Sequence, residues 1–167
     1  QNRNYLNFAR PLPDNRAYRD VHALYACEQL RGPLRDQADA LFNAAIAERG
    51  WSGLMSVVEA GQYEFADGLF YGGKGPSWSN RTLRSIVARH LSGVEVAACF
   101  DLHTGAGDYG HPMLMSIVES GYPALEDAQA LFGPWLFTLI TGANQISATG
   151  VAATSTGYTS QMLLDAL

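Results

Sequence analysis

The chain is poor in charge, and its few charges do not gather with one sign. Only 16% of its 167 residues are Asp, Glu, Lys or Arg, and the formal net charge is −5. Proteins that bind phosphate backbones normally present a basic face. Here the 11 Lys and Arg residues are scattered, and even the densest group, Arg81, Arg84 and Arg89, is soon followed by Glu95 and Asp101. The sequence therefore argues against a nucleic-acid partner.

Long apolar runs, cysteines and a leader sequence are also lacking. No stretch approaches the roughly 20 apolar residues of a membrane helix, so no membrane partner is expected. The two cysteines, Cys27 and Cys99, lie in apolar segments, which predicts buried free thiols in a reducing compartment. Nothing resembles a signal peptide, so we expect a cytoplasmic protein. The starting residues 1–5 and the apolar helical pattern that stops at Leu167 suggest a chain truncated or processed at both ends.

Hydrophobic residues make up 47% of the chain, a proportion typical of a globular domain. Apolar residues at helical spacing predict helices near residues 18–31, 34–49, 51–60 and 79–91. Ser77 or Ser79 can cap the last of these. Between them, residues 61–78 are rich in Gly, Tyr and Phe, and a loop this long in a compact domain is usually functional or mobile.

The clearest strand is the nearly continuous apolar run from Val94 to Leu102, which suits a central strand covered on both faces. A second strand is predicted within 111–118, a helix at 125–131, and a helix from Thr159. Residues 134–141 fit a strand or a helix, and 144–157 read as a loop. The alternation of helices with a buried strand predicts one α/β domain over residues 1–167. We expect three layers, α/β/α, with a mixed, mostly parallel sheet.

Asp101 and His103 lie at the carboxyl end of the predicted strand, the edge where open α/β sheets bind ligands. Two residues apart on a strand, they share a face. An imidazole there can ligate zinc while a carboxylate fixes its other nitrogen, and the alternative is a hydrogen-bonded structural histidine. The glycines that follow, at 105, 107 and 110, allow a ligand to approach the backbone closely.

Other polar residues give weaker signals. Asp108, Tyr109 and His111 form a second cluster, in which His111 is either a ligand or an ordinary loop histidine. Lys74 lies in a glycine-rich loop without the spacing of a phosphate-binding loop. The acidic residues Glu59, Glu64 and Asp67 are expected to be surface charges. No Gly-x-Ser-x-Gly elbow is present, which argues against a serine hydrolase.

Five motifs occur in an order that resembles the carboxypeptidase A-like superfamily of zinc enzymes. They are Asn2-Arg3-Asn4-Tyr5, Gly61-Gln62-Tyr63, Gly68-Leu69-Phe70-Tyr71-Gly72-Gly73, Trp78-Ser79-Asn80 and Asp101-Leu102-His103-Thr104-Gly105. The likeness is to the uncharacterised bacterial branch near the aspartoacylase and succinylglutamate desuccinylase group. It covers most of the chain up to about Gly110 and is faint beyond.

This resemblance implies roles for particular residues. Asn2 and Arg3 match the pair that binds the terminal carboxylate of the substrate, and a guanidinium is well shaped for that. His103 matches the third zinc ligand, with Asp101 as its partner, and Tyr158 is a candidate for the tyrosine that contacts substrate. The family's His-x-x-Glu pair is absent, since neither His22 nor His90 has Glu at the third following position. The resemblance places that pair and the catalytic glutamate outside residues 1–167.

The expected function is therefore zinc-dependent hydrolysis of amide or peptide bonds in substrates that carry a carboxylate, either N-acyl amino acids or short peptides. In that reaction Zn²⁺ polarises the carbonyl and activates water, and a glutamate acts as general base. Two alternatives remain: a non-catalytic module that binds carboxylates or peptides, and a structural or assembly domain. The sequence leaves the oligomeric state open.

Overall fold

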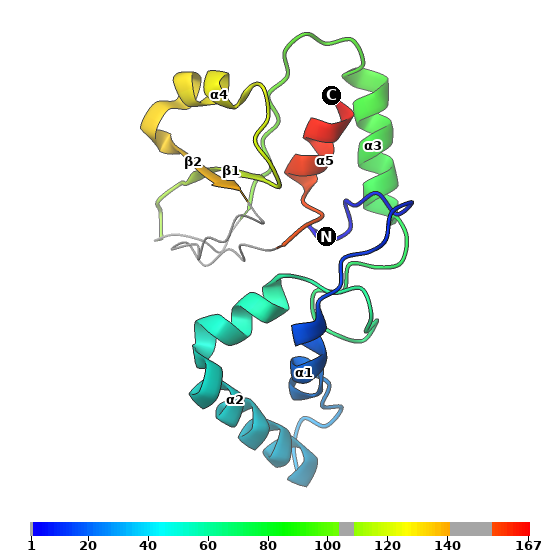
Figure 1. Ribbon diagram of the computed structural model, residues 1–167, viewed down its shortest axis with the longest axis vertical. Helices are drawn as coiled ribbons and strands as arrows, with labels where there is room; N and C mark the ends of the chain where they lie inside the picture. The colour runs from blue at the N-terminus through cyan, green and yellow to red at the C-terminus, as the bar shows by residue number, and fades with distance from the viewer. Residues whose placement is uncertain (1, 104–108, 141–154) are drawn as a thin grey trace.

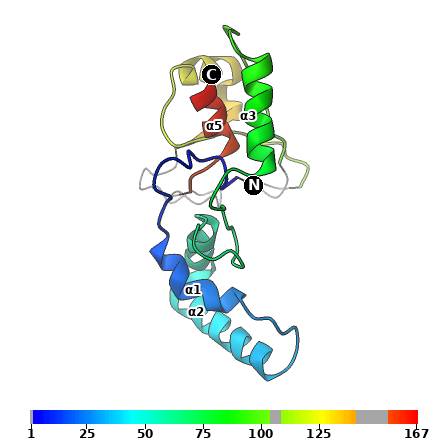
Figure 2. The ribbon, with the colours of Figure 1, turned by 90° about the vertical axis from the view of Figure 1, so that its right-hand side faces the viewer.

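The computed structural model describes residues 2–103, 109–140 and 155–167. Two groups of elements lie at opposite ends of an elongated molecule (Figures 1 and 2). One group contains the helices α1 (Arg16–Tyr25) and α2 (Pro33–Glu59). The other contains α3 (Trp78–His90), β1 (Leu114–Val118), α4 (Leu125–Phe132), the short 3-10 helix η1 (Gly133–Trp135), β2 (Leu136–Ile140) and α5 (Thr159–Ala166).

The first half is built on the packing of α1 against α2. Tyr18, Val21, Leu54 and Val58 are almost fully buried and form its core. Inside α2, Gly50 has a φ of 71° and a ψ of 157°, values outside the helical range, so the helix is kinked there. The kink separates the two helices that the sequence pattern predicts on either side of this glycine.

The second half is a small β–α–β unit covered by helices. β1 and β2 pair in parallel, with Leu114 opposite Leu136 and Val118 opposite Ile140, and α4 lies in the connection between them. Helix α5 packs on β1 and on α3. The apolar side chains buried within the helices and strands of this half are Val87, Val118, Leu139 and Met162.

This arrangement is a mixture of helices and strands with a two-stranded parallel sheet, which is compatible with the α/β class. The predicted strand at Val94–Leu102 is wrong: residues 94–103 contain neither helix nor strand. The side chains of Val96 and Leu102 are 86% and 93% exposed. An apolar run becomes a buried strand only where neighbouring strands pair with its backbone through hydrogen bonds. Within the described ranges, β1 and β2 are the only paired strands.

Most other predicted elements are confirmed. The helices near 34–49, 51–60, 79–91, 125–131 and from 159 are present, and the strand within 111–118 corresponds to β1. Residues 134–141, which fitted either a strand or a helix, contain β2. The first helix ends earlier than predicted, at Tyr25. Cys27 is half-buried and Cys99 is exposed, so the expectation of a buried thiol at Cys99 is wrong. Most of the predicted loop at 144–157 lies outside the described residues.

Ser77, rather than Ser79, caps α3: its hydroxyl accepts a hydrogen bond from the backbone N–H of Asn80, at 3.2 Å. Ser77→Ala should therefore lower the free energy of unfolding by about 1 kcal/mol, the usual cost of losing a side-chain cap. Urea denaturation measures the change. Ser79→Ala is the matched control, because Ser79 lies within the helix and should change stability by less than about 0.5 kcal/mol. Equal losses in the two variants would contradict the assigned cap.

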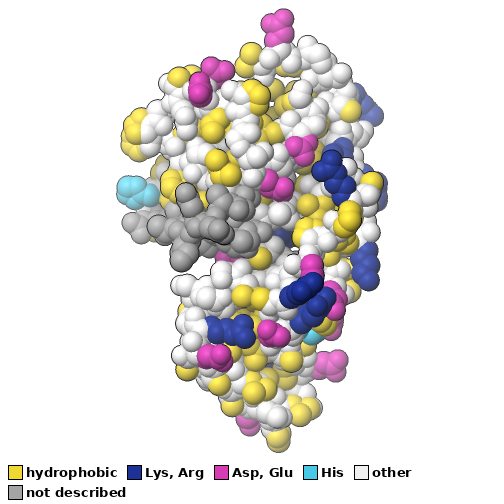
Figure 3. All heavy atoms as spheres, in the orientation of Figure 1, with side chains coloured by type: hydrophobic (Ala, Val, Ile, Leu, Met, Phe, Trp, Pro, Cys, Tyr) yellow, Lys and Arg dark blue, Asp and Glu magenta, His cyan; other side chains and the backbone are white. Residues whose placement is uncertain are grey.

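Acidic and basic side chains are interspersed on the face shown in Figure 3, beside apolar ones. Among the helices that the structure describes, none combines the length and the apolar character needed to cross a membrane.

Candidate functional site

The N-terminal segment runs between the two halves of the molecule (Figure 1), and Arg3 in this segment contacts Glu59 of one half and Tyr158 of the other. Its guanidinium reaches the end of α2, where Nε and Nη2 donate to the carbonyl oxygen of Glu59 at 3.0 and 2.5 Å. Next to it, the backbone N–H of Tyr5 donates to the carbonyl of Gly157, which precedes α5, at 3.2 Å. Arg3 thus satisfies a carbonyl that the end of a helix leaves without an intrahelical partner. The same segment contacts both halves.

The guanidinium of Arg3 keeps unused hydrogen-bond donors. Besides its two bonds to Glu59, its Nη1 donates to the carbonyl of Asn2 at 2.9 Å. A guanidinium has five N–H groups, one on Nε and two on each terminal nitrogen. Two N–H groups therefore remain without a partner among the described residues, one on each terminal nitrogen. A pair of this kind is what a carboxylate needs for two parallel hydrogen bonds.

The guanidinium of Arg3 lies over two aromatic rings. Its central carbon is 4.7 Å from the ring centroid of Tyr158 and 5.8 Å from that of Phe70, both within the range of cation–π attraction. Phe70 has a φ of 51°, which bulky residues rarely adopt. Two backbone hydrogen bonds hold this turn, from Gln62 to the Phe70 carbonyl and from Gly72 to the Gln62 carbonyl. The rings restrict the movement of the guanidinium, and they do so without occupying its N–H groups.

The backbone of Arg3 is held as closely as its side chain. The hydroxyl of Tyr63 donates to the carbonyl oxygen of Arg3 at 2.6 Å, and burial raises the pKa of this tyrosine, which keeps the hydroxyl protonated. Gly72 and Gly157 approach so closely that a Cβ on either would lie within 3 Å of that same oxygen. A Cβ on Gly61 would be 2.6 Å from Cδ of Arg3. Glycine is needed at these contacts because each leaves no room for a side chain.

Asn2 is held at the start of α5. Its side-chain oxygen accepts hydrogen bonds from the hydroxyl and the backbone N–H of Thr159, at 2.7 and 3.4 Å. This contact joins residues 157 positions apart in the sequence. The amide nitrogen of Asn2 has no partner among the described residues, so it remains a possible further donor to a ligand. We refer to the following residues as the Arg3 site: Asn2, Arg3, Glu59, Tyr63, Phe70, Gly72, Gly157 and Tyr158.

The structure brings three of the predicted site residues together, because Asn2, Arg3 and Tyr158 all belong to the Arg3 site. The hydroxyl of Tyr158 is paired with that of Ser155, and the residue is buried. Tyr158 therefore presents its ring, rather than its hydroxyl, to Arg3. Its predicted contact with substrate stays a prediction.

His103 and Asp101 form a separate pair. Nε2 of His103 lies 3.1 Å from Oδ2 of Asp101, and the two side chains are 57% and 51% exposed. This is the arrangement in which a carboxylate fixes one imidazole nitrogen and leaves the other, Nδ1, to bind a metal. No hydrogen bond or ion pair joins the pair to the Arg3 site within the described residues.

The chemistry of these donors fits one position in a zinc site but not a complete site. Catalytic zinc is held by three protein ligands. Within residues 2–103, 109–140 and 155–167, no group of three His, Cys, Asp or Glu side chains could hold a metal ion. Asp108 and the glycines at 105 and 107 lie outside the described residues. Tyr109 and His111 are exposed, as is Lys74.

Glu59 is not the exposed surface charge that the sequence analysis predicts. The side chain is half-buried at the end of α2. Burial raises the pKa of its carboxyl group, an effect that the nearby positive charge of Arg3 partly reverses. The carboxylate has no hydrogen-bond or ion-pair partner in the described part of the chain. A desolvated, unpaired carboxylate beside a cationic group is typical of binding and catalytic sites.

Asn4 and Asn80, which lie in two of the motifs that carry the family resemblance but were assigned no role, hold the glycine-rich loop against the N-terminal segment. The side-chain nitrogen of Asn4 donates to the carbonyls of Gly72 and Gly75, at 2.7 and 3.0 Å. Its oxygen accepts from the N–H of Ser77, at 2.8 Å. The Asn80 side chain donates to the Asn4 carbonyl at 2.5 Å. Both asparagines are buried, so these bonds satisfy polar groups that water cannot reach.

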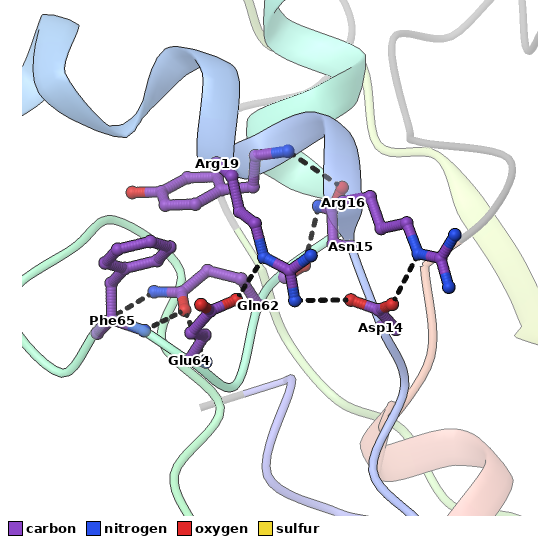
Figure 4. Close-up of polar contacts among 9 residues, drawn as sticks. Asp14, Asn15, Arg16, Arg19, Gln62, Glu64 and Phe65 are labelled. Atoms are coloured by element: carbon purple, nitrogen blue, oxygen red, sulfur yellow. Dashed lines mark hydrogen bonds and ion pairs between the residues drawn. The ribbon is translucent and has the colours of Figure 1, made fainter.

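A shallow cavity of about 300 Å³ lies beside the start of α1 and is lined by Tyr63 and Lys74 among others. Its charged residues are mostly paired with one another (Figure 4). Arg19 donates from Nε to Glu64 at 2.7 Å and from Nη2 to Asp14 at 3.4 Å. Asp14 also accepts from Arg16. Exposed ion pairs contribute little to stability, and this network leaves the cavity without a strong net charge.

Comparison with known proteins gives one match. Residues 1–166 match the family described as "Protein of unknown function (DUF2817)". No curated protein and no solved structure matches the chain.

Proposed function

Because the chain belongs to the DUF2817 family, whose description assigns no activity, we propose a function from the geometry of the site. The chain forms the carboxylate-binding part of a zinc-dependent hydrolase that cleaves amide or peptide bonds. Its substrates are N-acyl amino acids or short peptides with a free carboxylate. The observation that carries this proposal is the pair of unused N–H groups on Arg3, one on each terminal nitrogen.

The surroundings of Arg3 favour binding of a carboxylate over a purely structural role. Three of its N–H groups fix the guanidinium to backbone carbonyls, and the rings of Tyr158 and Phe70 lie over it. A donor pair that is already oriented loses little conformational entropy when a ligand binds. The free amide nitrogen of Asn2 can add a third hydrogen bond.

Zinc is the cofactor that we propose, on the basis of the resemblance to the carboxypeptidase A-like superfamily and the chemistry of the His103 pair. His103 would be one ligand, and Asp101 would hold its imidazole in the orientation that exposes Nδ1. When bound, zinc supplies polarisation of the scissile carbonyl and activation of water. The three-layer α/β/α architecture is part of the same proposal.

The function is tested through the carboxylate. An N-acetylated amino acid should bind the protein, and the same compound with its carboxylate converted to an amide should bind at least about tenfold more weakly, since it loses a bidentate, charge-assisted contact. Isothermal titration calorimetry measures both. Arg3→Gln should abolish the difference, whereas Arg3→Lys should keep only part of it because a lysine lacks the planar fork. Equal binding of the two compounds to the unaltered protein would refute the proposed site.

A non-catalytic binding module is the second candidate, because the Arg3 site needs no metal to bind a carboxylate. The two functions are separated by adding zinc to the full-length protein, residues 1–167 together with any sequence that flanks them, and following hydrolysis of the bound N-acetyl compound. Turnover that depends on zinc and on His103 supports the hydrolase. Carboxylate-dependent binding without turnover supports the binding module.

A further inference from the structure

The carboxylate of Glu59 and the guanidinium of Arg3 form two opposite charges in one site. The Glu59 carbonyl accepts two hydrogen bonds from Arg3, which places the residue directly beside the guanidinium. Even so, the side-chain carboxylate makes no ion pair with Arg3 within 4 Å, and it has no other partner in the described part of the chain. The two charges are close but remain separately available.

The position of Glu59 favours a bound cation. It is the last residue of α2, and the C-terminal end of a helix carries a partial negative charge that attracts cations. A carboxylate at that end adds to the negative potential. Because the side chain is half-buried, solvent screens its charge less than it would screen an exposed one. Arg3 occupies the carbonyl but does not neutralise the carboxylate by direct contact.

We infer that Glu59 binds the ammonium group of the ligand whose carboxylate binds Arg3, so that the site selects compounds with a free amino group. This rests on the proposed function and narrows it: of the two substrate classes, short peptides with a free amino terminus are preferred to N-acyl amino acids. Acylation removes the positive charge and leaves Glu59 partly desolvated without a counterion, which weakens binding.

The test uses a dipeptide with a free amino terminus and its N-acetyl form, both with free carboxylates. By calorimetry the unaltered protein should bind the free-amine form about tenfold or more tightly, the order expected of one charge-assisted hydrogen bond. Glu59→Gln should remove this preference, mainly by weakening the binding of the free-amine form. Glu48→Gln, on an exposed position of the same helix, is the matched control and should keep the preference.

Each failure identifies a different error. If Glu59→Gln keeps the preference, or weakens both compounds equally, the role of Glu59 is refuted. If both compounds bind the unaltered protein equally, and Arg3→Gln weakens both, the inference fails while the proposed carboxylate site stands. If Arg3→Gln changes neither affinity, the proposed function itself fails.

Discussion

Gly72→Ala is expected to lower the free energy of unfolding by about 3 kcal/mol, the upper end of the usual cost of overpacking a closely packed site. A Cβ at this position would overlap the ring of Tyr63 and lie 2.7 Å from the carbonyl oxygen of Arg3. Neither neighbour can move freely, because the Tyr63 hydroxyl is bound to that same oxygen. The variant should also lose most of its affinity for carboxylates, since relieving the overlap displaces Arg3.

Gly75→Ala provides the control for this prediction. Gly75 belongs to the same loop, and a Cβ there would meet no atom within 4 Å. Its carbonyl still accepts the hydrogen bond from Asn4 after the substitution. Gly75→Ala should therefore change stability by less than about 0.5 kcal/mol and leave ligand binding intact. If chemical denaturation gives the same stability for both variants, the close packing of Gly72 against Arg3 and Tyr63 is incorrect.

Leu54→Ala should lower the free energy of unfolding by about 2–5 kcal/mol. The side chain is 0% exposed and belongs to the core formed with Tyr18, Val21 and Val58. Truncation removes apolar contacts and leaves a cavity that the two packed helices can close only in part. Thermal and urea denaturation should both show the loss.

Leu41→Ala makes the matched comparison on the same helix. The Leu41 side chain is 51% exposed, so its truncation should cost less than about 1 kcal/mol. Comparable losses in the two variants would show that Leu54 does not lie in the core. Neither leucine belongs to the Arg3 site, so any effect on carboxylate binding should follow from stability alone.

Local patterns in the sequence predict local elements well. The apolar spacing of α3 and α4 and the glycine at the kink of α2 are properties of neighbouring residues, and the structure places these elements as predicted. The choice between Ser77 and Ser79 as helix cap could not be made in advance, because both are hydroxyl residues at the right place. It depends on backbone geometry: Ser77 is extended, with a φ of −66° and a ψ of 168°.

The segment Val94–Leu102 shows where such patterns fail. Its composition favours a strand, but a strand exists only where other backbone segments complete its hydrogen bonds. Composition does not reveal whether those segments are present. The position of Asp101 and His103 at a strand end was inferred from that strand, and it fails with it. The two side chains are nevertheless in contact, although the strand geometry from which their shared face was inferred is absent.

The Arg3 site could be predicted only in part. Family resemblance pointed to Asn2, Arg3 and Tyr158, and the structure brings these residues together. The role of Glu59 was missed, since a single acidic residue carries no periodic signal. Asn4 and Asn80 lie in the motifs of the resemblance, but their supporting contacts were not predicted. Their importance arises from contacts between residues more than 50 positions apart, which one sequence does not reveal.

The contact between Asn2 and Thr159 closes a loop that contains nearly the whole described chain. Loop closure of this length has a high entropic cost that is recovered only after other contacts exist. Helical contacts between neighbouring elements, such as those of α1 with α2, form over much shorter separations and therefore faster. We expect the two halves to acquire their structure first and the Arg3 site to assemble in the last step of folding, so that ligand-binding competence appears later than helix content.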